Sequence, residues 1–124
     1  DKVIFTGAIP QEEIQAYYHC ANIFATASRS ETQGLTVIEA IASDIIPLCI
    51  DDAVFTKLLP KDCIFTNQDD YINKVLSNMN LPLLHITTKK KLKEVMKEYS
   101  METYAKKVLT IYNRVIEKYN TKKK

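Results

Sequence analysis

Residues Ser28–Ala40 read SRSETQGLTVIEA, and they follow a short apolar run at Ile23–Ala27. The run is rich in strand-forming residues, and from Leu35 onward the apolar residues recur at helical spacing. A strand, a polar turn and a helix in this order form the place where open α/β sheets bind ligands, outside the carboxyl ends of the strands. Gly34 would allow a positive φ before the helix. We therefore expect the N–H groups of residues 35–37 to face outward as an anion site.

Two carboxylates flank this expected anion site. Glu31 lies on the turn, and Glu39 follows eight positions later inside the helix. Acids beside a phosphate site are suited to accept hydrogen bonds from the hydroxyls of a sugar or a ribose. The alternative interpretation is that Glu31 is a solvated loop acid and Glu39 a helix-surface acid.

The composition indicates one globular domain. The chain has 124 residues, a hydrophobic fraction of 46% and a net charge of +2, which is too small to imply a nucleic-acid partner. No apolar run approaches the ~20 residues needed to span a bilayer. The three cysteines, Cys20, Cys49 and Cys63, form no C-x-x-C motif, so we expect buried free thiols in a reducing cytosol and no metal site.

The pattern along the chain predicts strands that alternate with helices, and hence an α/β fold with a parallel sheet. Pro10 is expected to open the first helix, and Ser100 is expected to cap the last. The expected strands are Val3–Phe5, Ile23–Ala27, Ile45–Ile50 and Cys63–Thr66. Helices are expected over Leu35–Ser43 and around Val54–Leu59. A further helix is expected to begin after a cap at Asp69 or Asp70 and to end at a break at Asn80–Pro82. Another is expected to begin after a cap at Thr87 or Thr88.

The Glu-x7-Glu spacing of Glu31 and Glu39 resembles the nucleotide-sugar loop of retaining GT-B glycosyltransferases, glycosyltransferase family 4. The ETQGLT variant is most similar to bacterial members such as diacylglycerol glucosyltransferases. Other parts of the chain also resemble family motifs: Val3–Gly7, Tyr18–Phe24 with Asn22 in place of an Asp, and Ser100–Tyr112. The segment Ala42–Pro47 departs from the family by lacking a glycine. The resemblance covers nearly the whole chain.

The resemblance implies a Rossmann-like parallel sheet flanked by helices, in which residues 1–124 are an incomplete C-terminal half of a GT-B fold. The first β-α units and the N-terminal acceptor domain would be absent, so this fragment alone should be inactive. The implied reaction moves a hexosyl group from a nucleotide diphosphate sugar, a UDP-sugar above all, to a hydroxyl with retention, without a metal or other cofactor. Glu31 would act in catalysis and hold the donor sugar, and Glu39 would hold the ribose. The remaining donor-binding positions would be the backbone at Gln33, Gly34, Leu35 and Thr36, with Gly7 and Ala8 near the base.

Partners beyond the nucleotide sugar are left as alternatives. The basic residues concentrate after Lys89, which is typical of a solvated helix face but also suits an anionic membrane, so we expect a cytoplasmic protein that can sit at the inner face of the membrane. The exposed strand Val3–Thr6 is expected to pair beside Ile23–Ala27 or with a second copy.

The main alternative to a glycosyltransferase is a Rossmann-like module that binds a nucleotide or phosphorylated ligand without chemistry. The chain has neither G-x-G-x-x-G nor the P-loop motif, which argues against NAD and ATP sites.

Overall fold

The computed structural model describes residues 2–80 and 82–121, and within them the chain forms a three-stranded parallel sheet in the order β1-β2-β3. The strands are β1 (Ile23–Thr26), β2 (Ile46–Ile50) and β3 (Ile64–Phe65). Ile23 pairs with Ile46, and Cys49 pairs with Ile64. The α/β class and the parallel sheet flanked by helices are thus confirmed.

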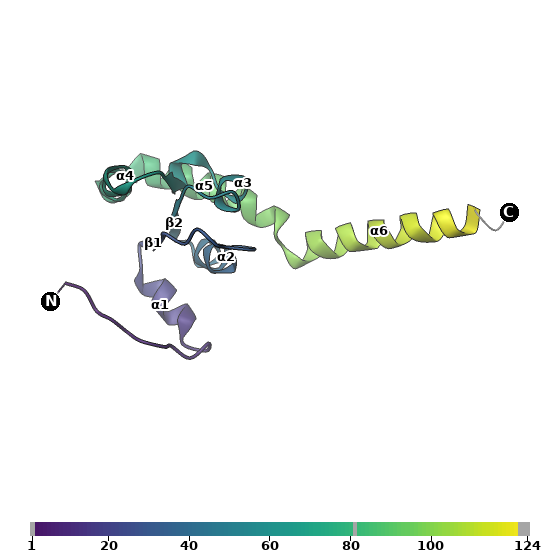
Figure 1. Ribbon diagram of the computed structural model, residues 1–124, viewed down its shortest axis with the longest axis horizontal. Helices are drawn as coiled ribbons and strands as arrows, with labels where there is room; N and C mark the ends of the chain where they lie inside the picture. Colours follow the sequence, from purple (N-terminus) through teal and green to yellow (C-terminus); the bar gives the residue numbers. More distant parts are fainter. Residues whose placement is uncertain (1, 81, 122–124) are drawn as a thin grey trace.

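Helices cover both faces of this sheet (Figure 1), with α2 on one face and α4 on the other, and α5 contacts both of them. The last helix, α6, extends away from the rest of the molecule. The helices are α1 (Ile14–Cys20), α2 (Leu35–Ala42), α3 (Phe55–Leu58), the short 3-10 helix η1 (Lys61–Cys63), α4 (Gln68–Asn80), α5 (Pro82–Glu98) and α6 (Met101–Thr121).

The core forms around β2, whose five residues are all buried because it is the central strand. Val37 of α2, Phe55 of α3 and Leu92 of α5 pack into the same cluster. Burying a side chain of this size contributes about 1.5–3 kcal/mol. These contacts fix α2 against the sheet and so hold the loop that precedes it in place.

The expected strand at Val3–Phe5 is absent. Val3 is 67% exposed, Ile4 84% and Phe5 95%, and these residues belong to no helix or strand. The prediction that this segment pairs beside β1 in its own chain was therefore wrong. A strand is stabilised by pairing with a neighbour, and its sequence pattern alone does not supply that neighbour. Pairing with a second copy stays a prediction.

Two predicted helix starts were also wrong. The N-cap of α4 is Asn67, whose Oδ1 accepts the N–H of Asp70 at 2.9 Å, while an Asp70 carboxylate oxygen accepts the N–H of Thr66 at 3.0 Å. Asp69 and Asp70 thus lie in the first turn, where a carboxylate interacts favourably with the helix dipole. Thr87 and Thr88 lie inside α5, which already begins at Pro82.

α1 begins at Ile14 and residues 11–13 form a turn, so the expectation that Pro10 opens this helix was also wrong. The expected break at Asn80–Pro82 includes residue 81, which lies outside the described residues. The other predicted elements agree with the structure to within a few residues. The Ser100 cap is confirmed, because its Oγ accepts the N–H of Thr103 at 3.2 Å. The apolar face of α6 is exposed, with Tyr112 at 62%. Cys49 and Cys63 are buried as expected, but Cys20 is exposed at the end of α1. Among the described helices, none is long and apolar enough to cross a membrane.

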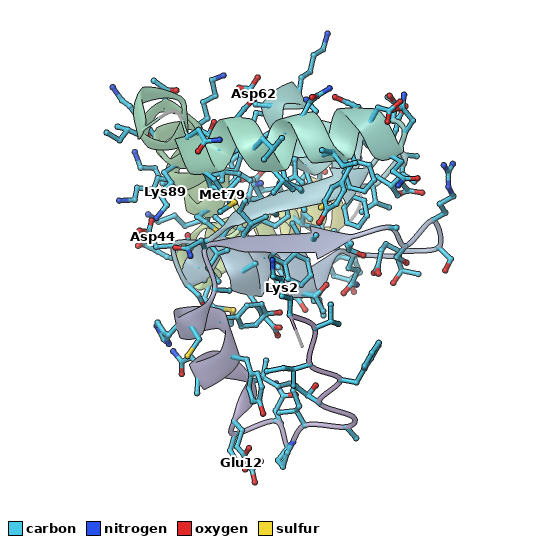
Figure 2. All side chains as sticks on the ribbon, turned by 90° about the vertical axis from the view of Figure 1, so that its left-hand side faces the viewer. Lys2, Glu12, Asp44, Asp62, Met79 and Lys89 are labelled. Atoms are coloured by element: carbon cyan, nitrogen blue, oxygen red, sulfur yellow. The ribbon has the colours of Figure 1, made fainter. Side chains whose placement is uncertain are left out.

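The turn before β2 compensates for the glycine that the sequence lacks there. Asp44 has a φ of 62°, a left-handed conformation that Asp tolerates better than most residues. Its carboxylate lies 2.7 Å from Nζ of Lys89 on α5 (Figure 2). Asp44 therefore both forms the turn and connects it to α5 through an ion pair.

Candidate functional site

The loop between β1 and α2 ends at Gly34, which is the N-cap of α2 and has φ 65° and ψ 36°. The positive φ expected at this glycine is confirmed. Gly34 is also buried: a Cβ built on it would lie 3.4 Å from Cε1 of Phe55 and 3.5 Å from Cδ2 of Leu58. A glycine is thus required here both for the backbone turn and for the close approach of α3.

The first turn of α2 presents two backbone N–H groups without an acceptor. Among the described residues, the N–H groups of Leu35 and Thr36 donate no hydrogen bond, as expected for the start of a helix. The N–H of Val37 bonds to the carbonyl oxygen of Gly34 at 3.0 Å, so the expectation that it would also be available was wrong. Two N–H groups at the positive end of the helix dipole suit an anionic oxygen.

Glu31 lies on this loop and is half-buried. Its carboxylate is near the thiol of Cys49 at the carboxyl end of β2: burial raises the pKa of Cys49 to about 12, and the charges of Cys63 and then Glu31 add to the effect. Figure 2 shows the loop continuing past the carboxyl end of β1. Glu31 therefore lies near the carboxyl end of β2, the side of a parallel sheet on which ligands bind.

Glu39 lies on the exposed side of α2 and is held by Tyr18, which was not among the expected site residues. The hydroxyl of Tyr18 on α1 lies 3.3 Å from Oε2 of Glu39 and 3.2 Å from the carbonyl oxygen of Thr36. Partial burial, followed by the charge of Glu39 and the hydrogen bond to it, raises the pKa of the Tyr18 hydroxyl. In the sequence Tyr18 stands out only as the first residue of the Tyr18–Phe24 resemblance, and its phenolic oxygen was the one signal that it would need a polar partner.

A shallow cleft lies beside this contact. It has a volume of about 270 Å³ and runs between the start of α1 and the side of α2, with Gln11, Gln15 and Glu39 among its lining residues. Amide and carboxylate groups of this kind bind hydroxyl-bearing ligands.

A larger cavity of about 460 Å³ opens at the carboxyl ends of the three strands. Arg29 of the loop lines it, together with Phe65 and Tyr71, whose rings lie 5.1 Å apart. The guanidinium of Arg29 forms no ion pair with any residue that the structure describes. The cavity has the size of a small-molecule site and offers one cation and two aromatic surfaces.

The structure brings some of the predicted site residues together and leaves others apart. Gln33 is exposed on the loop next to Gly34, and Leu35 and Thr36 begin α2, so these positions share one turn with Glu31. Gly7 and Ala8 lie on the exposed segment before α1, and a Cβ built on Gly7 would meet no atom within 4 Å. Their expected place near a base, like the roles of all these residues toward a ligand, stays a prediction.

Comparison with known proteins gives a family match and three similar curated proteins. Residues 1–82 match the family described as "Glycosyl transferases group 1". An alpha-monoglucosyldiacylglycerol synthase of Acholeplasma laidlawii is 34% identical over 119 residues, which cover 94% of this chain and 30% of that protein. The protein of the same name from Streptococcus pneumoniae (strain ATCC BAA-255 / R6) is 32% identical over 116 residues, covering 90% of this chain and 26% of that protein.

The third relative matches a shorter segment. A mannosylfructose-phosphate synthase of Agrobacterium fabrum is 44% identical over 43 residues, covering 35% of this chain and 10% of that protein. The chain thus spans less than a third of the length of each of these curated relatives. No solved structure matches the chain.

Proposed function

The chain belongs to the group 1 family of glycosyl transferases, and from this membership we propose that it forms the donor side of a glycosyltransferase site. The reaction is transfer of a hexosyl group from a nucleotide diphosphate sugar, a UDP-sugar in the first instance, to a hydroxyl acceptor. The anomeric configuration is retained, and neither a metal nor another cofactor takes part.

The observation that carries the proposal is the start of α2. The N–H groups of Leu35 and Thr36 have no acceptor among the described residues, and the carboxylates of Glu31 and Glu39 flank them in the sequence. A diphosphate placed at these N–H groups gains the favourable end of the helix dipole. Because the diphosphate is also the leaving group, the same N–H groups would stabilise the charge that develops on it in the transition state.

The two carboxylates bind different parts of the donor. Glu31, over the carboxyl end of β2, accepts hydrogen bonds from hydroxyls of the sugar and lies near the reacting carbon. Glu39, one turn inside α2, accepts hydrogen bonds from the ribose hydroxyls. The backbone from Gln33 to Thr36 contacts the sugar and diphosphate, and Gly7 and Ala8 lie near the base.

The acceptor is proposed to be a lipid hydroxyl at the inner face of a membrane. The two relatives that match almost all of this chain are named as synthases of a monoglucosyldiacylglycerol. The chain matches 30% and 26% of their lengths, so the acceptor is proposed to bind a further domain, and these 124 residues alone are expected to bind donor without transferring sugar.

Nucleotide binding to the 124-residue chain tests the donor site directly. Isothermal titration with UDP and with UDP-glucose should give saturable binding, and Glu39→Gln should weaken it about tenfold or more, since a hydrogen bond to a charged group is lost. Glu117→Gln, which changes an exposed glutamate on α6, is the matched control and should leave the affinity unchanged. No binding of either nucleotide, or equal weakening by the control, would contradict the donor-site proposal.

Transfer and its stereochemistry are tested in the intact protein. Glu31→Gln should abolish most of the turnover with a diacylglycerol acceptor while nucleotide affinity changes less. The anomeric proton coupling of the product, measured by NMR, should show the same configuration as the donor. An inverted product would disprove retention, and nucleotide binding without any transfer would favour the non-catalytic binding module.

A further inference from the structure

We propose that Tyr18 is a positioning residue for Glu39: its hydroxyl holds one carboxylate oxygen so that the other is presented to the two vicinal hydroxyls of a bound ribose. The inference deepens the proposed function and rests on it. Tyr18 itself would not touch the ligand.

The side chain of Tyr18 joins three elements of the fold, because its hydroxyl contacts α2 and its ring contacts β1. Tyr18 comes from α1, and its oxygen lies 3.3 Å from Oε2 of Glu39 and 3.2 Å from the carbonyl oxygen of Thr36. Its ring packs against Phe24 of β1, with centroids 6.0 Å apart and planes inclined by 52°. The ring is thereby fixed between the strand and the helix that border the candidate site.

The Tyr18 hydroxyl has one proton and lies between two acceptors, so it influences the position of the Glu39 carboxylate. The carboxylate carries a negative charge and the Thr36 carbonyl oxygen a partial negative charge, so the two acceptors repel each other unless a donor lies between them. Partial burial and the adjacent Glu39 charge raise the Tyr18 pKa, so the hydroxyl keeps its proton at neutral pH and remains a donor. Tyr18 therefore favours one orientation of the Glu39 side chain.

Only one of the two Glu39 oxygens is used in this contact. Oε2 accepts from Tyr18, whereas Oε1 has no hydrogen-bond partner among residues 2–80 and 82–121. An exposed glutamate normally samples many rotamers and loses that freedom when it binds a ligand. A carboxylate already held at one oxygen loses less conformational freedom on binding, and this preorganisation increases the affinity.

The test uses nucleotides that differ in a single ribose hydroxyl. Tyr18→Phe, which keeps the ring, should weaken binding of UDP by about three- to tenfold, the size expected for losing one preorganising hydrogen bond. Binding of 2′-deoxy-UDP, which lacks one hydroxyl of the pair that Glu39 would hold, should change less than UDP binding does. In the Glu39→Gln background the same substitution should have almost no further effect, because the two residues act as one unit.

Tyr17→Phe is the matched control, since Tyr17 is the neighbouring tyrosine on α1, is 46% exposed and forms no hydrogen bond with a described residue. It should leave both affinities unchanged. The inference would be overturned if Tyr18→Phe weakened the binding of UDP and of 2′-deoxy-UDP equally and did so in the Glu39→Gln background as well. Such a result would show a merely structural role for Tyr18. An unchanged UDP affinity in a folded Tyr18→Phe variant would also overturn the inference while leaving the proposed function intact, whereas no UDP binding by the unmodified chain would remove both.

Discussion

Gly34 lies against the ring of Phe55, so that a methyl group added at Gly34 would come within 3.4 Å of Cε1 of that ring. The same glycine has a φ of 65°. We predict that Gly34→Ala lowers the free energy of unfolding by about 1–3 kcal/mol, because it adds left-handed backbone strain and crowds a buried ring. Urea denaturation followed by circular dichroism measures this loss.

Gly7 provides the control for this substitution. Its φ is 68°, yet a Cβ built there would meet no atom within 4 Å, and the segment around it is exposed. Gly7→Ala should therefore cost clearly less than Gly34→Ala, since an exposed segment outside any helix or strand can relax its backbone. Equal losses for the two variants would mean that the contact with Phe55 contributes nothing.

The sequence could predict the turn at Gly34 because the information there is local. A strand, a glycine and a helical repeat lie within about twenty residues, and each limits the conformation of the next. The Tyr18 contact with Glu39 could not be predicted in this way, because it depends on how α1 packs against α2. The strand expected at Val3–Phe5 is absent for the same reason: the composition favours a strand, but no strand of the described chain pairs with this segment.

The inward face of α2 shows the limit within a correctly predicted element. The expected apolar spacing began at Leu35, but Leu35 is 59% exposed, whereas Val37, Ala40 and Ile41 are buried. In a short helix several sets of apolar residues fit the same period, and the direction in which the chain leaves β1 decides which set turns inward.

Cysteine reactivity should distinguish the three thiols. Cys20 is exposed, whereas Cys49 and Cys63 are buried and burial raises the pKa of each to about 12. In the native protein at pH 8 we expect a thiol reagent to modify Cys20 rapidly and the other two only after addition of denaturant, because the thiolate is the reactive form. Rapid modification of two or more thiols in the native protein would contradict the buried positions.

The raised pKa values of Cys49 and Cys63 also predict a pH dependence of stability. Their ordinary value is 9.0, so the unfolded chain releases these protons at lower pH than the folded chain does. The stabilisation is complete below pH 9 and is lost as the pH rises toward 12. The measurement is the midpoint of urea denaturation from pH 8 upward, in the unmodified chain and in a Cys49→Ala/Cys63→Ala variant. The midpoint should decline in both, because lysines and tyrosines titrate in both proteins. The decline should be smaller in the variant, because it lacks the two thiols.

The open edge of β1 predicts self-association. Only one side of β1 is paired within the described chain, and a cavity of about 630 Å³ beside it is lined by apolar residues including Ile23, Val75 and Met79. An unpaired edge next to an apolar surface is a template for another strand, and residues 3–6 of a second copy are an exposed, apolar candidate.

Light scattering during gel filtration should show a dimer whose fraction rises with concentration. Ile4→Lys should shift the equilibrium toward monomer, whereas Ile111→Lys, at an exposed isoleucine of α6, should not. A strictly monomeric chain at the highest concentration reached would disprove strand addition. Loss of the dimer in the Ile111 variant alone would place the contact on α6.

The basic side of α6 is predicted to bind anionic vesicles. Lys107, Arg114 and Lys118 follow one another at helical spacing beside the exposed apolar face that includes Tyr112 and Ile116. A basic flank next to an apolar face suits the interface of a membrane that carries negative lipids. In sedimentation assays the chain should bind vesicles that contain phosphatidylglycerol, and binding should fall steeply as salt is raised, since salt screens exposed charges.

The charge variant Lys107→Glu/Lys118→Glu should lose most of this binding, because each lysine near an anionic surface contributes about 1 kcal/mol. Lys57→Glu/Lys61→Glu makes the same change in net charge on α3 and η1, away from α6, and should bind nearly as well as the unmodified chain. Equal losses for the two variants would mean that net charge alone drives the attraction. Absence of binding at low salt would exclude a membrane contact through this helix, and the exposed apolar face of α6 would then require a protein partner.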